Sequence, residues 1–141
     1  MDSVKEKLNS RYAVAALITS PQGIPLVRDR KKPKPYYWKL PGGRSEGKET
    51  PSETIIREIK EEIGLSFAPK DIKLVCEEER ENHIFCLFQA NPISLEGLKK
   101  IGNDEEEVKL FLPEQLKNLT DFFSPHRKIL EEIKYFEAIK A

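Results

Sequence analysis

The residues best suited to chemistry lie on one predicted helix and indicate a site for a divalent cation. At about 100° per residue, the carboxylates of Glu58, Glu61 and Glu62 fall within an arc of roughly 100°. A bordering arc of similar width holds the predicted buried face of the same helix, formed by Ile55, Ile56, Ile59 and Ile63. Carboxylates placed together beside a buried face repel one another, and a hard cation such as Mg²⁺ or Mn²⁺ relieves that repulsion.

The three carboxylates alone are more typical of a solvated acidic surface than of a metal site, so the flanking residues matter. Gly42 and Gly43 precede the helix by a short loop, and the absence of side chains lets backbone approach the same cluster. Arg57 stands directly before Glu58 and is placed to orient a carboxylate through paired hydrogen bonds. These neighbours favour a metal site over an acidic surface.

The stretch from Gly43 to Leu65 resembles the Nudix box of the Nudix hydrolases. Every position that defines the box matches: Gly43, Glu49, Arg57, Glu58, Ile59, Glu61, Glu62, Ile63, Gly64 and Leu65. The preceding segment 38–42 resembles the usual lead-in to the box, and the order of expected elements is similar to that of the family over about residues 10–140.

The resemblance implies a helix–sheet–helix sandwich that hydrolyses a nucleoside diphosphate linked to another moiety, with Mg²⁺ or Mn²⁺ as cofactor. It implies that Glu58, Glu61 and Glu62 are metal ligands, joined by the backbone carbonyl of Gly42 or Gly43. By the same resemblance Glu49 is an accessory acid and Arg57 orients a glutamate. Metal ions suit this chemistry because they neutralise phosphate oxygens and lower the pKa of water.

A further acidic ligand from outside the box is expected in the loop 103–107. Glu106 and Asp104 are the leading candidates there, although a solvated loop explains either residue equally well.

The basic loop 28–34 is the strongest cluster of cations in the chain and leads directly towards Gly42. We expect Arg28, Arg30 and Lys32 to help hold the phosphates of the substrate, the alternative being a mobile surface loop. Tyr37 or its neighbour Tyr36 is the better candidate to stack on a base, and Trp38 is expected in the core. His83 and His126 receive no role from the sequence.

The elements that must position these residues predict an α/β (α+β) sandwich, a mixed β-sheet with helices packed on its faces. Strands are expected at 12–18, 24–28, 38–40, 72–78, 83–90 and 108–112. The second of these is interpreted as the return strand of a hairpin with the first, 41–43 as a tight turn, and 77–81 as part of a hairpin with a solvated tip. Helices are expected at 51–63, 113–119 and 125–140. The first has a capping box of Thr50 and Glu53 and ends at Gly64, and the last has Ser124 as its N-cap.

Composition excludes several other classes. The 141 residues, 16.3 kDa, suit one domain over 1–141. Equal numbers of acidic and basic residues, 24 of each, argue against nucleic-acid or membrane-surface binding by bulk charge. No apolar run reaches the roughly 18 residues of a membrane span, and residues 1–11 lack the apolar core of a signal peptide. Cys76 and Cys86 have no metal-binding spacing and predict reduced core residues of a cytoplasmic protein.

A metal-dependent nucleotide pyrophosphohydrolase is therefore the leading hypothesis, with a small-molecule diphosphate as substrate and an oligomeric state left open. Two alternatives remain: a Nudix-type nucleotide sensor without turnover, and an acidic interaction domain without a ligand. The region after Leu65 lacks the proline expected about fifteen positions on in ADP-ribose hydrolases and the tyrosine of dinucleoside polyphosphate hydrolases. Nucleoside triphosphates, nucleotide sugars and other substrates stay open.

Overall fold

A computed structural model describes residues 12–139 of the chain. Two expectations fall outside these residues: the character of segment 1–11 and the end of the last helix at Lys140. Among residues 12–139, no helix has the length and apolar character that crossing a bilayer requires.

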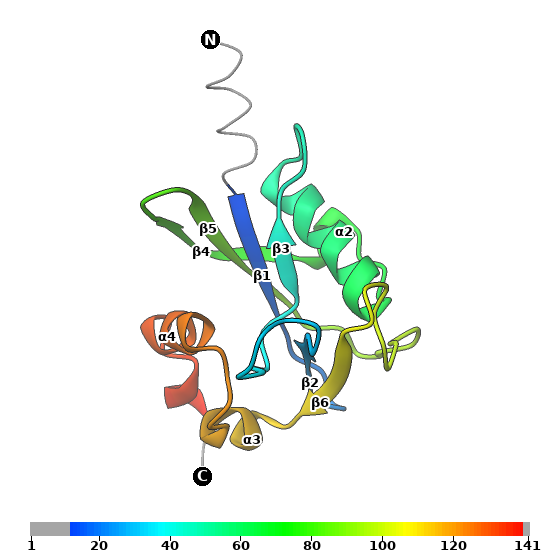
Figure 1. The fold of residues 1–141 in the computed structure, drawn as a ribbon, viewed down its shortest axis with the longest axis vertical. Coiled ribbons are helices and arrows are strands. Elements are labelled where there is room, and N and C mark those ends of the chain that lie inside the picture. Colours follow the sequence, from blue (N-terminus) through cyan, green and yellow to red (C-terminus); the bar gives the residue numbers. More distant parts are fainter. Residues whose placement is uncertain (1–11, 140–141) are drawn as a thin grey trace.

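The centre of the molecule is a four-stranded mixed sheet in the order β3-β1-β5-β4. Its strands are β1 (Tyr12–Ile18), β3 (Gly42–Arg44), β4 (Lys73–Glu79) and β5 (Ile84–Ala90). β1 runs parallel to β5 and antiparallel to β3, and β4 and β5 form the expected antiparallel hairpin. A second, two-stranded sheet pairs β2 (Ile24–Arg28) with β6 (Glu107–Phe111) (Figure 1).

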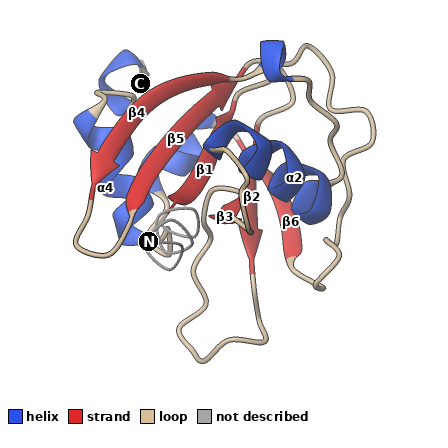
Figure 2. Ribbon diagram, turned by 90° about the horizontal axis from the view of Figure 1, so that it is seen from above, coloured by secondary structure: helices blue, strands red, loops and turns tan. Residues whose placement is uncertain are grey.

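Helices cover both faces of the central sheet, which confirms the predicted sandwich. Alternate residues of β1 face opposite cores, because successive side chains of a strand point to opposite sides. Val14 packs in the same cluster as the isoleucines of α2 (Pro51–Ile63), whereas Leu17 packs with Leu116 of α3 (Pro113–Asn118) and Ile129 of α4 (Ser124–Glu132). Figure 2 shows α2 in front of the strands and α4 behind them. Short 3₁₀ turns occur at η1 (Pro69–Asp71) and η2 (Phe136–Ala138).

Local sequence sets both ends of α2, as predicted. The Thr50 hydroxyl accepts a hydrogen bond from the Glu53 amide at 3.2 Å, and the Thr50 amide donates to the Glu53 carboxylate at 2.9 Å. Gly64 ends the helix in the left-handed region, with φ of 82°. Ile55, Ile59 and Ile63 are fully buried, and the acidic arc borders this buried face, with Glu62 at 6% exposure inside the boundary.

The predicted hairpin of β1 and β2 is wrong. A turn does form between Ser20 and Gly23, but β2 leaves it to pair with β6 in the other sheet. The reason is that β1 already has β3 on one edge and β5 on the other, which leaves it no free hydrogen-bonding edge.

The expected tight turn at 41–43 is also wrong, because Gly42 and Gly43 begin strand β3 and pair with Ala15 and Val14. The requirement for glycine at position 42 is space: a Cβ there would overlap the Val14 carbonyl oxygen. The brief strand expected at 38–40 is instead two isolated bridges, one from Lys39 to β2 and one from Trp38 to Phe122.

The last helix is shorter than expected. α4 ends at Glu132, Lys134 adopts a left-handed φ of 61°, and the chain continues into η2. Ser124 is the first helical residue, and the N-cap position belongs to Phe123, whose side chain makes no capping hydrogen bond. Cys86 is buried, Cys76 is partly buried, and both are free thiols, as the sequence predicted.

Candidate metal and substrate site

The three carboxylates on the acidic face of α2 differ in exposure, with Glu62 buried and Glu61 the most exposed. Glu62 is 6% exposed, whereas the side chains of Glu58 and Glu61 are 15% and 44% exposed. Glu62 reaches strand β3, where its Oε1 accepts a hydrogen bond from the Gly42 amide at 2.6 Å. The helix thus presents carboxylates directly beside the backbone of the Gly42-Gly43 pair.

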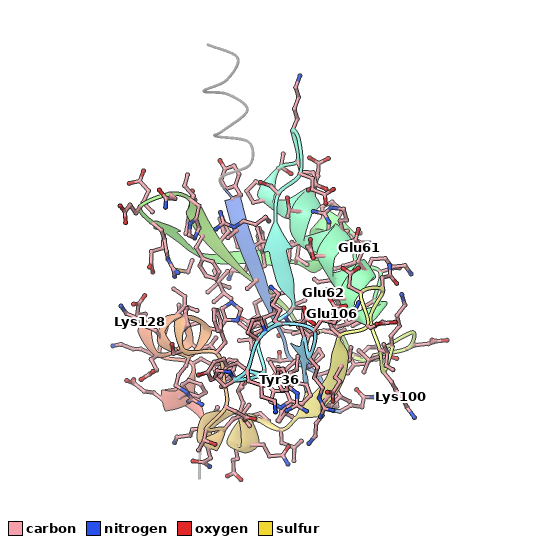
Figure 3. The ribbon with its side chains drawn as sticks, in the orientation of Figure 1. Tyr36, Glu61, Glu62, Lys100, Glu106 and Lys128 are labelled. Atoms are coloured by element: carbon pink, nitrogen blue, oxygen red, sulfur yellow. The ribbon has the colours of Figure 1, made fainter. Side chains whose placement is uncertain are left out.

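Glu106 joins this group from the segment before β6, as Figure 3 shows for Glu61, Glu62 and Glu106. Backbone hydrogen bonds dock that segment on the end of α2: the Asn103 amide donates to the Glu61 carbonyl and the Lys99 amide to the Ile63 carbonyl. Gly102 makes the approach possible, because a Cβ there would lie 2.5 Å from the Glu62 carbonyl oxygen.

Of the two acids expected from this loop, Glu106 is the one that lies beside the carboxylates of α2. Its residue is 7% exposed, and its Oε1 accepts a hydrogen bond from the Asp104 amide at 3.0 Å. Asp104 itself is exposed and contributes its backbone. Glu106 therefore has the burial and position that a ligand from outside the helix requires.

Burial and mutual repulsion favour protonation in this cluster. The pKa of Glu62 is raised to about 8, chiefly by burial and also by the charges of Glu58 and Glu106, against the opposing hydrogen bond from the Gly42 amide. Burial also raises the pKa of Glu58, against the opposing charge of Arg57. At neutral pH Glu62 therefore retains its proton unless a positive charge replaces it.

Arg57 holds the carboxylates in place. Its Nε and Nη2 donate to the two Glu49 oxygens at 2.7 and 3.0 Å, and its Nη1 donates to Glu58 and Glu61 at 2.9 and 3.2 Å. Nη2 also donates to the Arg44 carbonyl at 3.1 Å. Hydrogen bonds from Arg57 lower the pKa of Glu49 to about 2, so Glu49 stays ionised. With its donors engaged in this way, Arg57 is placed to orient glutamates.

The donor set fits Mg²⁺ or Mn²⁺ in chemistry, since the converging groups are hard carboxylate oxygens whose repulsion a cation would offset. Gly43 supports the fit, because a Cβ at that position would lie 2.6 Å from the Glu58 carboxylate carbon. Within residues 12–139, however, no three acidic, histidine or cysteine side chains yet converge on one point as a metal site. Glu58 and Glu61 instead share the Nη1 donor of Arg57.

A cleft of about 730 Å³ includes the Gly42-Gly43 pair in its lining, whereas the α2 glutamates are not among its lining residues. Its aromatic lining consists of Tyr36, Tyr37, Phe85, Phe123 and His126. Its basic lining consists of Lys32, Lys39, Arg44 and Arg80. Flat apolar surfaces with cations nearby suit a base and the phosphates attached to it.

The cations expected to hold substrate divide into two groups. Lys32 and Tyr37 line the cleft, whereas Arg28 and Arg30 are not among its lining residues. Arg28 lies over the Trp38 ring, 4.3 Å from its centroid, and pairs with Glu107 at 3.3 Å. Arg30 also pairs with Glu107. The basic loop is thus partly neutralised by the first residue of β6, which sits opposite Arg28 in the strand register.

His126 is the cleft residue that sequence reasoning missed. Its Nδ1 accepts a hydrogen bond from the Leu40 amide at 3.0 Å, across 86 positions of sequence. Burial, together with the smaller effects of the charges of Lys39 and Arg80, lowers its pKa to about 3. A lone histidine in the first turn of a predicted helix carries no signal of such a contact, so nothing in the sequence indicated it.

Comparisons with known proteins agree on a family. The model of the NUDIX domain matches residues 9–133. An ADP-ribose pyrophosphatase of Methanocaldococcus jannaschii is 32% identical over 129 residues, 89% of this chain and 73% of that protein. A human 8-oxo-dGDP phosphatase is 36% identical over 108 residues, 76% of this chain but only 32% of that protein.

Solved structures agree in fold. MutT, in a study of the enzymes from Aliivibrio salmonicida and Vibrio cholerae, superposes with a TM-score of 0.74 at 17% identity, covering 91% of this chain and 98% of that one. A bifunctional NMN adenylyltransferase/ADP-ribose pyrophosphatase of Francisella tularensis, complexed with AMP and a manganese ion, gives 0.66 at 25% identity, covering 88% and 42%.

Proposed function

Because this chain belongs to the Nudix hydrolase family, we propose that Glu58, Glu61, Glu62 and Glu106, with the Gly43 backbone, bind Mg²⁺ or Mn²⁺ for its pyrophosphohydrolase reaction. The observation that carries the assignment is the buried Glu62 carboxylate, held against the Gly42 amide and repelled by its acidic neighbours. A carboxylate that burial and charge keep protonated is an unfavourable arrangement unless a cation completes it.

The residues of the chain divide the work of the reaction. A bound divalent ion supplies neutralisation of the phosphate oxygens and acidification of water. Glu62 would hold the ion in its ionised form, and Glu106 and Glu58 would provide further negative charge around it. Arg57, supported by Glu49, keeps the glutamates oriented without contacting substrate. Lys32 and Tyr37 bind substrate from the cleft side of the Gly42-Gly43 strand.

We infer that the substrates are derivatives of purine nucleoside diphosphates. Both named relatives, an ADP-ribose pyrophosphatase and an 8-oxo-dGDP phosphatase, act by name on such compounds. The aromatic lining of the cleft and its cations suit a base and a diphosphate. The absent proline after the box weighs against ADP-ribose and leaves oxidised or unmodified purine nucleotides as the main competitors.

The remaining inferences concern the whole protein. Its length supports one domain over 1–141, and its free cysteines support a cytoplasmic location. Its zero net charge supports a small-molecule partner in place of nucleic acid or a membrane.

A substrate panel tests the proposal. ADP-ribose, dGDP, dGTP, 8-oxo-dGDP and UDP-glucose are incubated with Mg²⁺ or Mn²⁺, and products are separated by chromatography so that the cleaved bond is identified. The expected result is metal-dependent cleavage within the pyrophosphate of at least one purine compound, abolished by EDTA and reduced by orders of magnitude in Glu62→Gln. Tight binding of these compounds with no cleavage would instead identify a sensor module.

A further inference from the structure

One histidine in the cleft presents a hydrogen-bond donor that the metal site does not use. His126 lies in the first turn of α4 between two aromatic rings, with centroids 6.1 Å from Phe85 and 4.9 Å from Phe123. The Phe123 ring meets it nearly edge-on, at 87°. These contacts and the helix fix where the imidazole stands in the cleft wall.

The Leu40 amide determines which ring nitrogen carries the proton. A backbone N–H is a donor only, so the Nδ1 that accepts it at 3.0 Å is unprotonated, and the proton of the neutral ring is on Nε2. The surroundings keep the ring neutral: Lys39, Arg80, Lys32 and Arg44 are cations of the cleft lining, while Asp29 is its one acid among the described residues, and His83 also lines it. Burial and the charges of Lys39 and Arg80 lower the pKa of His126 to about 3, so the donor persists across physiological pH.

The Nε2–H group has no hydrogen-bond acceptor within residues 12–139, and it is not among the buried atoms that lack a partner. His126 is only partly buried and lines the cleft. A neutral donor that is fixed in direction, bordered by flat rings and open to the cleft is suited to an acceptor atom on the edge of a base. A phosphate would bind more strongly to the charged donors of the neighbouring lysines and arginines.

We propose that His126 is a specificity-determining residue whose Nε2–H donates a hydrogen bond to a ring nitrogen or carbonyl oxygen on the edge of a bound purine. The inference rests on the proposed function, because it names how the substrate class of that site is selected. The base lies against the aromatic wall of the cleft, and its phosphates extend towards Gly42-Gly43 and the glutamates. His126 selects the base and does not take part in the cleavage chemistry.

Two substitutions separate this role from a purely structural one. His126→Asn keeps an acceptor near the position of Nδ1 for the Leu40 amide and removes the donor at Nε2. His126→Gln instead places an amide donor near the position of Nε2. The probes are GMP, AMP and ribose 5-phosphate, whose binding is measured by calorimetry without metal, so that no catalysis is required.

The wild-type protein should bind at least one of the two purine nucleotides more tightly than ribose 5-phosphate. His126→Asn should weaken that nucleotide by about threefold to tenfold, the range for one hydrogen bond, and leave ribose 5-phosphate unchanged. His126→Gln should recover part of the loss. Nitrogen-15 NMR of the imidazole should show protonated Nε2 from pH 5 to 8, with a shift of that signal when the preferred nucleotide is added.

The proposal is overturned if the purine nucleotides bind no better than ribose 5-phosphate, if His126→Asn weakens all three probes equally, or if the proton is found on Nδ1. Equal weakening would mean that the contact is made to the sugar or that the side chain only supports Leu40. A different result would refute the proposed function alone. If nucleotide selectivity depends on His126 but the substrate panel shows no cleavage, the role of His126 is supported and hydrolysis is refuted.

Discussion

Replacing Glu62 by glutamine should stabilise the metal-free protein while destroying its response to metal. Glu62 is 6% exposed and faces the charges of Glu58 and Glu106. Glutamine keeps the size of the side chain and an oxygen for the Gly42 amide, but it cannot ionise. The substitution therefore removes an electrostatic penalty from the native state without opening a cavity.

The magnitude follows from linkage. The pKa of Glu62 is raised from 4.5 to about 8 in the folded protein, so the folded state binds this proton more tightly than the unfolded chain does. The resulting stabilisation is fully present below pH 4.5 and is lost as the pH rises through 8. At about 1.4 kcal/mol per pH unit, the free energy of unfolding at pH 7 is lower than that below pH 4.5 by on the order of 3 kcal/mol, because the native state keeps a proton that the unfolded chain releases.

Urea unfolding in EDTA at pH 5, 7 and 8.5 measures the effect. The excess of Glu62→Gln over the wild type in free energy of unfolding should be under about 1 kcal/mol near pH 5, about 3 kcal/mol at pH 7 and larger at pH 8.5. Saturating Mg²⁺ should reverse the order, because it stabilises the wild type by binding its native state and has little site left in the variant. Glu79→Gln, on the exposed edge strand β4, is the matched control and should follow the wild type throughout.

Two results would refute this reasoning. If Glu62→Gln in EDTA were less stable than the wild type at pH 8.5, the carboxylate would be stabilised by its surroundings and not repelled by them. If Mg²⁺ raised the stability of both proteins equally, Glu62 would not be part of the metal site.

Three further predictions test the surroundings of the site. Gly43→Ala should lower turnover at least tenfold, because its methyl group would overlap an α2 carboxylate. Gly47→Ala is the control: Gly47 has φ of 53° and open space around it, so the substitution should cost about 1 kcal/mol of stability and little activity. Equal kcat values for the two variants would contradict this. Arg57→Lys should lower kcat about tenfold or more, with a smaller change in KM, because an ammonium group cannot replace its paired hydrogen bonds; a wild-type kcat would remove its orienting role. Lys32→Gln should raise KM a fewfold at low salt, and this effect should weaken as salt rises. Arg30→Gln should change KM less, because Arg30 lies outside the cleft lining and pairs with Glu107. Steady-state kinetics in which Arg30→Gln has the larger effect on KM would reverse the assignment.

Helix α2 and its acidic face were predictable from the sequence because local interactions determine them. The capping box of Thr50 and Glu53 and the left-handed Gly64 bound the helix within a few residues of its own chain. The spacing of its isoleucines then fixes which side is buried, and with it the direction in which Glu58 and Glu62 project. Arg57 and its position beside Glu58 follow from the same helix.

Tertiary structure alone decided which other residues meet that face. Glu106 reaches Glu62 only because the chain around Gly102 docks on the end of α2, through contacts between segments about forty residues apart in sequence. The glycines at 42 and 43 extend as a strand, against the expectation of a turn, because they pair with β1. A Cβ at position 42 would meet the β1 backbone, and a Cβ at position 43 would meet the Glu58 carboxylate.

The same limit explains the basic loop and the missed histidine. Arg28 and Arg30 were expected to hold substrate, but β6 pairs with β2 and brings Glu107 to them, a register that no local pattern encodes. The amide of Leu40, far away in sequence, donates a hydrogen bond to Nδ1 of His126 and thereby leaves the ring proton on Nε2. Side-chain spacing along one helix is a property of the chain, whereas hydrogen bonds between distant segments depend on how the sheets and helices pack, and this packing decides which charges and donors remain free for a substrate.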